Sequence, residues 1–172
     1  MAVTAKPLKS SNRPLAAEAD RLTEAIELLF FAYRDFISDP DELLAEYDFG
    51  RAHHRVVHFV GRNPGITVAE LLNILRITKQ SLARVLKQLI ERGFIEQETG
   101  KQDRRQRLLF LTPKGSELAE RLAIPQRNRV AQALEKAGPG SDEAWRKVLL
   151  ALVNDEDRPE VEHRIAKAPA RG

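Results

Sequence analysis

The chain has 172 residues, of which 42% are hydrophobic and 31% are charged. This composition is typical of one globular domain, or of a small domain with appendages, and excludes a disordered or fibrous protein. There is no cysteine, which excludes disulfides, thiolate metal sites and thiol redox switches. The longest apolar runs fall far short of the roughly 20 residues that cross a bilayer, and residues 1–14 lack the apolar core of a secretory signal. We therefore expect a cytoplasmic protein without membrane contact, with a disordered tail over residues 1–14.

Positive charge is concentrated in the middle of the chain. The net charge is only +3, but residues 62–107 carry ten Lys and Arg against five Asp and Glu. Such an asymmetry is expected where one part of a protein meets a polyanion. The densest part is the loop GKQDRRQR, which surrounds a single acid, Asp103, with four cations: Lys101, Arg104, Arg105 and Arg107.

A long amphipathic helix is predicted over residues 15–37, where apolar residues recur at helical spacing. The apolar stripe consists of Leu22, Ile26, Leu29, Phe30, Tyr33, Phe36 and Ile37. The helix should end near Pro40, because the residue before a proline avoids the helical region. The stripe is broader than a small neighbouring domain would cover, so it predicts contact with a partner chain.

Three shorter helices are predicted next. The first covers about residues 49–60 and is closed by the turn Asn63-Pro64-Gly65. Thr67-Val68-Ala69-Glu70 has the form of a capping box and opens a second helix, which runs to about Leu75. Thr78 can cap a third helix, whose apolar residues fall at helical spacing. They are Leu82, Val85, Leu86, Leu89 and Ile90.

A hairpin and two more helices complete the prediction. Residues 94–98 and 107–111 have the pattern of two strands around the basic loop. Thr112-Pro113 supplies an N-cap and a proline at the first position of a long helix, which Pro125 should kink or split. Ser141 is expected to cap a last helix, and the charged and small residues of 155–172 predict a frayed or disordered tail.

This order of elements predicts a winged helix-turn-helix over residues 48–112, in a mainly α protein with a small β-wing. The helix that begins after Thr78 would enter the major groove of DNA, with its first turn at base edges and its later cations at phosphates. The predicted base contacts are Thr78, Lys79, Gln80 and Ser81, and the predicted phosphate contacts are Arg84 and Lys87. The four loop cations would reach the DNA backbone and the neighbouring minor groove. The alternative for this loop is a solvated hairpin tip whose charge opposes aggregation.

The segment ITVAELLNILRITKQSLARVLKQLIERGFIEQE, followed by DRRQRLLFLTPKG, resembles the MarR family of bacterial transcription regulators. That family shares a pattern of the type D-x-R-x-x-x-L-x-L-T-x-x-G, which here runs from Asp103 to Gly115. The resemblance extends over about residues 15–153. It implies that Arg105 enters the minor groove and that Asp103 is its brace within the wing.

The resemblance also implies an assembly. MarR-family proteins are homodimers in which N- and C-terminal helices interlock, so residues 15–47 and 113–154 would form a helical dimerisation region. The two winged helices would bind a palindromic site with half-sites about 34 Å apart, more often as a repressor than as an activator. Many members are released from DNA by a small phenolic or anionic effector, for which Arg51, His54 and His58 are the candidate contacts. Members that sense oxidants through cysteine are a different branch, since this chain has none.

Other functions have weaker support in the sequence. His54 and His58 have the i, i+4 spacing of two metal ligands, but no third ligand is evident nearby, and partly buried or interface histidines are the alternative. No phosphate-binding loop, nucleophile elbow or H-E-x-x-H motif appears, so neither an enzyme nor a cofactor or metal is predicted. The remaining alternative is a winged helix used as a protein-protein interaction module. Such a module needs an apolar or acidic face where this chain has Lys79, Arg84 and Lys87.

Overall fold

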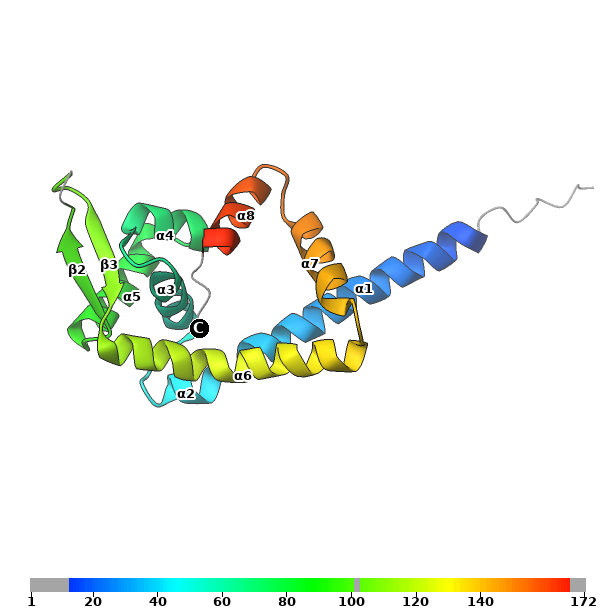
Figure 1. The fold of residues 1–172 in the computed structure, drawn as a ribbon, viewed down its shortest axis with the longest axis horizontal. Coiled ribbons are helices and arrows are strands. Elements are labelled where there is room, and N and C mark those ends of the chain that lie inside the picture. The colour runs from blue at the N-terminus through cyan, green and yellow to red at the C-terminus, as the bar shows by residue number, and fades with distance from the viewer. Residues whose placement is uncertain (1–12, 101–102, 168–172) are drawn as a thin grey trace, which may run out of the picture. The chain divides into compact units, whose positions relative to one another are not determined.

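The computed structural model describes residues 13–100 and 103–167, and it shows a mainly helical chain with a three-stranded sheet (Figure 1). This confirms the predicted fold class. The elements in chain order are α1 (Arg13–Ser38), α2 (Asp41–Ala45), α3 (Arg51–Arg62), β1 (Ile66–Thr67), α4 (Val68–Leu75), α5 (Lys79–Glu91), β2 (Ile95–Thr99), β3 (Arg107–Leu111), α6 (Pro113–Ala137), α7 (Ser141–Leu152) and α8 (Arg158–Lys167). The chain divides into two units, residues 1–38 and 39–172.

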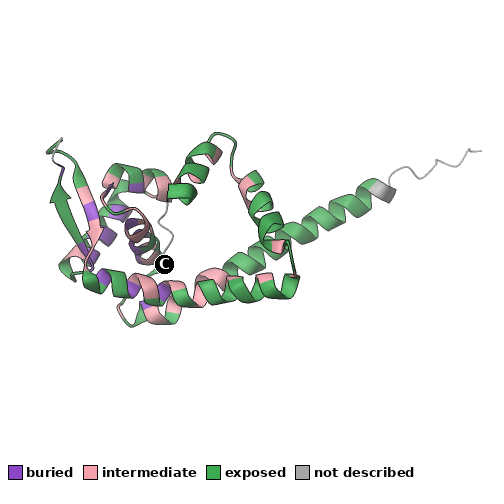
Figure 2. Ribbon diagram, in the orientation of Figure 1, coloured by how far each residue is buried: buried purple, intermediate pink, exposed green. Residues whose placement is uncertain are grey.

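Helix α1 makes up the described part of the first unit. Its apolar residues face solvent along nearly the whole helix: Leu22 is 55% exposed, Ile26 68% and Phe30 63% (Figure 2). A helix hides its apolar stripe only against another element. The stripe predicted from the sequence is therefore present, and nothing in the described part of its own unit covers it.

The core of the second unit lies where α3, α5, the sheet and the start of α6 meet, and buried residues concentrate there in Figure 2. The predicted inward face of α5 is confirmed, with Leu82, Val85, Leu86 and Leu89 buried and Ile90 packed against them. Because this face is held inward, the opposite face of α5 points to solvent.

The sheet is antiparallel in the order β1-β3-β2. Strands β2 and β3 form the predicted hairpin, with Ile95 opposite Leu111 and Thr99 opposite Arg107. Strand β1 has only two residues, and Ile66 pairs with Leu109. Strand β1 is followed immediately in the chain by α4 and pairs with β3. The pairing therefore joins the hairpin to the helix-turn-helix, and the two form one body.

Three threonines are the N-caps of α4, α5 and α6, as predicted. The hydroxyl oxygens of Thr67, Thr78 and Thr112 accept backbone N–H groups three residues on, at 3.2, 3.1 and 3.0 Å. Glu70 completes the capping box on Thr67, since its carboxylate accepts the N–H of Thr67 at 2.9 Å. Such caps satisfy donors that the first turn leaves unpaired.

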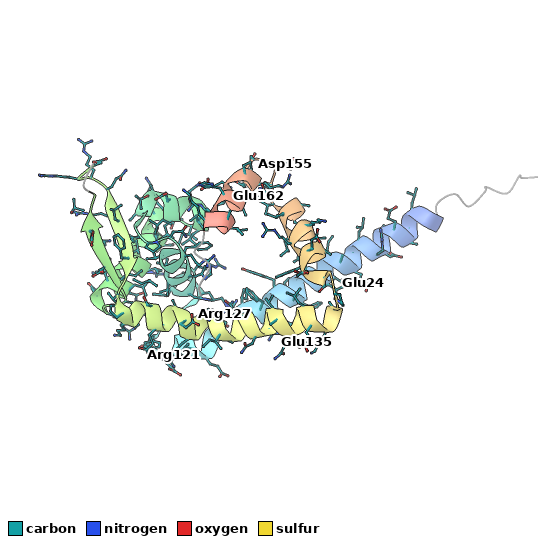
Figure 3. The ribbon with its side chains drawn as sticks, in the orientation of Figure 1. Glu24, Arg121, Arg127, Glu135, Asp155 and Glu162 are labelled. Carbon is teal, nitrogen blue, oxygen red and sulfur yellow. The ribbon has the colours of Figure 1, made fainter. Side chains whose placement is uncertain are left out.

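Pro125 was predicted to kink or split α6, and the split was wrong. Pro125 does not split it, and α6 runs unbroken from Pro113 to Ala137. A proline removes one hydrogen bond from a helix, but side chains from both halves of α6 are held by the chain before α3. Before the proline, the Arg121 guanidinium donates to the hydroxyl of Tyr47 at 3.0 Å; after it, Arg129 contacts both carboxylate oxygens of Asp39 at 2.6 Å. Arg127 pairs with Glu120 across the same point, and Figure 3 labels Arg121 and Arg127 along α6.

Two predictions about the C-terminal part were wrong. Ser141 is not an N-cap: Gly140 precedes the helix at φ +80°, and the Ser141 hydroxyl donates to the carbonyl of Leu134 at 3.1 Å. Residues 158–167 of the predicted frayed tail form helix α8. Arg158 ties this helix to the end of α7 by donating to the carbonyl of Leu150 at 2.9 Å. Residues 1–12 and 168–172 of the two predicted tails lie outside the described part.

Candidate nucleic-acid interface

The first turn of α5 carries the four predicted base contacts. Lys79 and Gln80 are exposed. Thr78 and Ser81 serve the cap: the Thr78 hydroxyl accepts the N–H of Ser81 and also donates to the Ser81 hydroxyl at 2.9 Å. The cap therefore fixes the geometry of this turn, and it leaves Lys79 and Gln80 as the side chains with most reach beyond it.

The two predicted phosphate contacts lie further along the same helix. Arg84 and Lys87 are both exposed. The ammonium nitrogen of Lys87 lies 3.7 Å from a carboxylate oxygen of Glu91, and the two side chains are 73% and 62% exposed. A pair as exposed as this contributes little, so Lys87 can exchange Glu91 for a phosphate at low cost.

The tip of the wing is a tight turn built on Asp103. Its carboxylate accepts the backbone N–H of Arg105 at 2.9 Å, and its carbonyl accepts the N–H of Gln106 at 3.0 Å. Gly100 closes the turn, since a Cβ at this position would lie 2.6 Å from the Asp103 carbonyl oxygen. Asp103 therefore braces the backbone that carries Arg104 and Arg105, both of which are exposed.

The other two loop cations differ in position. Arg107 is the first residue of β3, next to the loop, where its guanidinium donates to the hydroxyl of Thr99 at 2.8 Å across the two strands. This bond holds Arg107 against β2. Lys101 lies outside the described residues.

A groove of about 840 Å³ brings the two cationic sets together. Helix α5 contributes Lys79 and Lys87 to its lining, and the wing contributes Arg105 and Arg107. Apolar residues such as Leu72 and Leu86 also line it. The charge predicted from separate stretches of sequence thus faces one open concave surface.

The candidate effector residues lie on α3. Arg51 is engaged by Asp41, with guanidinium–carboxylate distances of 2.8 and 3.2 Å. The hydrogen bond from Arg51 holds the pKa of Asp41 below its ordinary value. His54 is half-buried and His58 exposed, and their rings are 6.5 Å apart. Within the described residues, no group of three His, Asp or Glu could hold a metal ion.

Burial gives His54 a pH-dependent effect on stability. Desolvation, and next the charge of His58, lower the pKa of His54 from 6.5 to about 4. Between these values the unfolded chain takes up a proton that the folded chain does not. The contribution of His54 to the free energy of unfolding is therefore complete above about pH 6.5, falls as the pH drops, and levels off near pH 4. Solvent still reaches part of the ring, so we expect the free energy of unfolding to fall by less than about 3 kcal/mol.

The substitution His54→Gln tests this effect. Between about pH 7 and pH 5, the free energy of unfolding in urea should fall less for His54→Gln than for the native protein. Equal decreases would contradict the assignment to His54.

The chain matches the MarR family sequence model over residues 47–106. It is also 47% identical over 135 residues to the HTH-type transcriptional regulator PetP of Rhodobacter capsulatus, with 78% of this chain and 81% of PetP covered. The chain belongs to the MarR family. MarR-family proteins are transcription regulators and not enzymes, in agreement with the prediction.

Solved MarR-family structures share the fold. FabT of Streptococcus pneumoniae, in complex with DNA, superimposes with a TM-score of 0.65 at 21% identity, over 78% of this chain and 94% of that one. A MarR-family regulator of Listeria monocytogenes, complexed with 26mer DNA, gives 0.64 at 21% identity, over 86% and 97% of the two chains. At these identities the likeness concerns the fold.

Two features of this MarR-family interface were not singled out from the sequence. Gly100 closes the wing turn and Thr99 holds Arg107. A glycine at the start of a hairpin loop is a turn signal that could have been used. The partner of Arg107 follows from the strand register, which the sequence does not specify.

Among the described helices, none is long and apolar enough to cross a membrane.

Proposed function

We propose that this MarR-family protein is a homodimeric, sequence-specific DNA-binding transcription regulator. The observation that carries the proposal is the groove that Lys79 and Lys87 of α5 line together with Arg105 and Arg107 of the wing. Positive side chains that line one groove suit the phosphates that border the major groove of DNA, with the first turn of α5 directed at base edges. The DNA complexes of FabT and of the Listeria regulator support this proposal.

Dimerisation accounts for the uncovered apolar surfaces. Besides α1, helix α7 exposes Trp145 by 46%, Val148 by 57% and Leu152 by 61%. Apolar area of this extent on helices marks a protein interface, and a second copy of the chain can cover it through a two-fold axis. A two-fold dimer would bind a palindromic operator, most simply as a repressor. Sedimentation at several protein concentrations tests the dimer, and a monomer throughout would overturn this part.

Release by a small effector completes the proposal. Arg51 and His54 lie on α3 beside Asp41, and burial keeps His54 neutral near pH 7. A neutral imidazole and a guanidinium can both donate hydrogen bonds to a phenolic or anionic ligand. His58, one turn beyond His54, completes the candidate set.

Selection of duplexes from a random-sequence pool by the purified protein tests the proposed function. Recovery of one palindromic sequence, bound with a steep loss of affinity as salt increases, is the expected result. The alternative, a protein-protein interaction module, predicts no enriched duplex and little salt dependence.

Arg84→Ala separates a phosphate contact from a base contact. If Arg84 holds a phosphate, its loss should weaken selected and unrelated duplexes alike and reduce the salt slope by about one. Fluorescence anisotropy at several salt concentrations measures both quantities. Lys167→Ala is the matched control, because it removes a positive charge from an exposed position of α8, outside α5, the wing and the predicted dimerisation region. A loss confined to one base position of the duplex would assign Arg84 to base recognition instead.

A further inference from the structure

His53 is a buried polar side chain behind the outward face of α5. It lies on α3, is 9% exposed, and is the one buried polar or charged residue within the described ranges 13–100 and 103–167. Its two ring nitrogens have different partners. Nδ1 is 3.1 Å from the backbone nitrogen of Gly50, and Nε2 is 2.6 Å from the side-chain oxygen of Gln88 on α5.

These partners fix the protonation of the ring. The backbone N–H of Gly50 can only donate, so Nδ1 must accept and carries no proton. Nε2 then carries the proton and donates it to Oε1 of Gln88. One bond thus holds the neutral imidazole at the N-terminus of α3, and the other joins it to the last turn of α5.

The ring is held on its faces and flanked by charge. Phe49 stacks on it with centroids 4.5 Å apart and planes inclined by 10°, and the Arg92 guanidinium lies 4.8 Å above the Phe49 ring. Arg84, Gln88 and Arg92, the C-cap of α5, are spaced four residues apart, which places them along one face of the helix. Arg84 and Arg92 are the charged groups that act on His53, and both disfavour a positive charge on its ring.

We propose that His53 is a positioning residue for DNA binding, which sets the rotation of α5 by its hydrogen bond to Gln88. This rests on the proposed function, because it presumes that α5 enters DNA. The aliphatic inward face of α5 determines which side of the helix points to solvent, but apolar contacts have no preferred direction. A hydrogen bond is directional, so the Nε2–Gln88 bond sets the fine rotation of α5 and with it the direction of Lys79 and Arg84.

Protonation would remove this control. An imidazolium has a donor at both nitrogens, so Nδ1–H would meet the N–H of Gly50 while a new charge appeared near Arg84 and Arg92. Burial is the main cause that lowers the pKa of His53, against smaller opposing effects of the bonds to Gln88 and Gly50. The residue is therefore neutral where the positioning bond is needed.

Two substitutions of His53 separate its two bonds. The side-chain oxygen of Asn can take the place of Nδ1 and accept from Gly50, but Asn is too short to reach Gln88. The amide nitrogen of Gln can take the place of Nε2 and donate to Gln88, while the acceptor for Gly50 is lost. We expect His53→Asn to bind the duplex selected by the native protein roughly tenfold more weakly, and His53→Gln to bind it within about threefold of the native protein.

Gln88→Met supplies the second half of the test. It removes the acceptor while keeping the length of the side chain, and it should reproduce the loss of His53→Asn. Adding His53→Asn to Gln88→Met should then cause no further loss of affinity. If His53→Asn does not fold, Gln88→Met alone decides, and native affinity in that variant overturns the proposal.

Thermal unfolding distinguishes positioning from stability. A role in stability alone would lower the melting temperature of both His53 variants and leave the affinity of the folded protein unchanged, which would overturn the proposal. Equal weakening by Asn and Gln would also overturn it. Failure of the native protein to select any duplex would instead overturn the proposed function, which is a separate result.

Discussion

Arg105→Ala is expected to lower the affinity for the selected duplex by 10- to 100-fold and to leave the stability of the protein unchanged. The Arg105 side chain is exposed at the tip of the wing and belongs to no part of the core. Its backbone N–H, and not its guanidinium, makes the bond to Asp103, so alanine preserves the turn. A guanidinium in a narrow minor groove contributes on the order of 1–3 kcal/mol, which corresponds to the expected range. Fluorescence anisotropy and thermal unfolding measure the two effects.

Asp103→Ala is the informative companion of this variant. It makes the wing more positive, so charge alone predicts tighter binding. Loss of the carboxylate also releases the N–H of Arg105 and loosens the turn, so weaker binding would show that geometry matters more than charge. If Arg105→Ala binds as the native protein does, the wing is the solvated, aggregation-resistant tip that was the alternative.

Helix starts and the inward face of α5 could be predicted because their causes are local. Thr67, Thr78 and Thr112 act on backbone groups three residues away, and the α5 pattern repeats within four turns. The wing could also be predicted, since the resemblance to MarR-family proteins assigned Asp103 its place. In each case the residues that determine the structure are neighbours in the sequence.

The missed features depend on contacts between distant residues. Strand β1 has two residues, too few for an alternating pattern, and it exists because β3 offers a partner. Helix α8 was predicted as a frayed tail, since its composition is charged, yet Asp157 at its start pairs with Arg76 at 2.5 Å, 81 positions earlier in the chain. The composition of a segment gives its number of charged residues but not the residues with which they form ion pairs.

In the candidate site, too, features with local causes could be predicted and features that depend on distant contacts could not. The cations of α5 and of the wing were identified from the sequence, and their shared groove followed from the predicted order of elements. The pairing of Arg51 with Asp41 was not foreseen, although the two lie ten positions apart, because the short helix α2 between the predicted elements was missed. The bond between His53 and Gln88 spans 35 positions and two helices, and no pattern in either helix predicts it.

The joint between the wing and α6 explains why the family pattern ends in glycine. The hydroxyl of Thr112 donates to the carbonyl of Gly93 at 2.7 Å, and its backbone N–H donates to the carbonyl of Phe94 at 3.1 Å. The first turn of α6 is thereby drawn onto the chain that enters β2. Gly115 lies at the contact, where a Cβ would be 2.0 Å from the Phe94 carbonyl oxygen and 3.0 Å from its carbonyl carbon.

Gly115→Ala is therefore expected to destabilise the protein by about 3 kcal/mol or more. The obstructing atoms belong to the backbone of Phe94, a buried core residue, and cannot move aside as a flexible side chain could. Relief requires α6 to shift away from β2, which breaks the Thr112 bonds and opens the core around Leu118. Overpacking of this kind commonly costs 1–3 kcal/mol, and more where the backbone must move. Urea unfolding followed by circular dichroism measures the difference.

Gly50→Ala is the matched control for this substitution. A Cβ at Gly50 meets nothing within 4 Å, and its φ of −117° suits any residue. Its backbone N–H to His53 is retained, so the change should cost no more than about 1 kcal/mol, the usual effect of alanine at an N-cap. If both variants unfolded at the urea concentration of the native protein, α6 would not approach β2 as closely as described. A large loss confined to Gly115→Ala would show that this contact fixes the wing, and with it the groove, against the long helix α6.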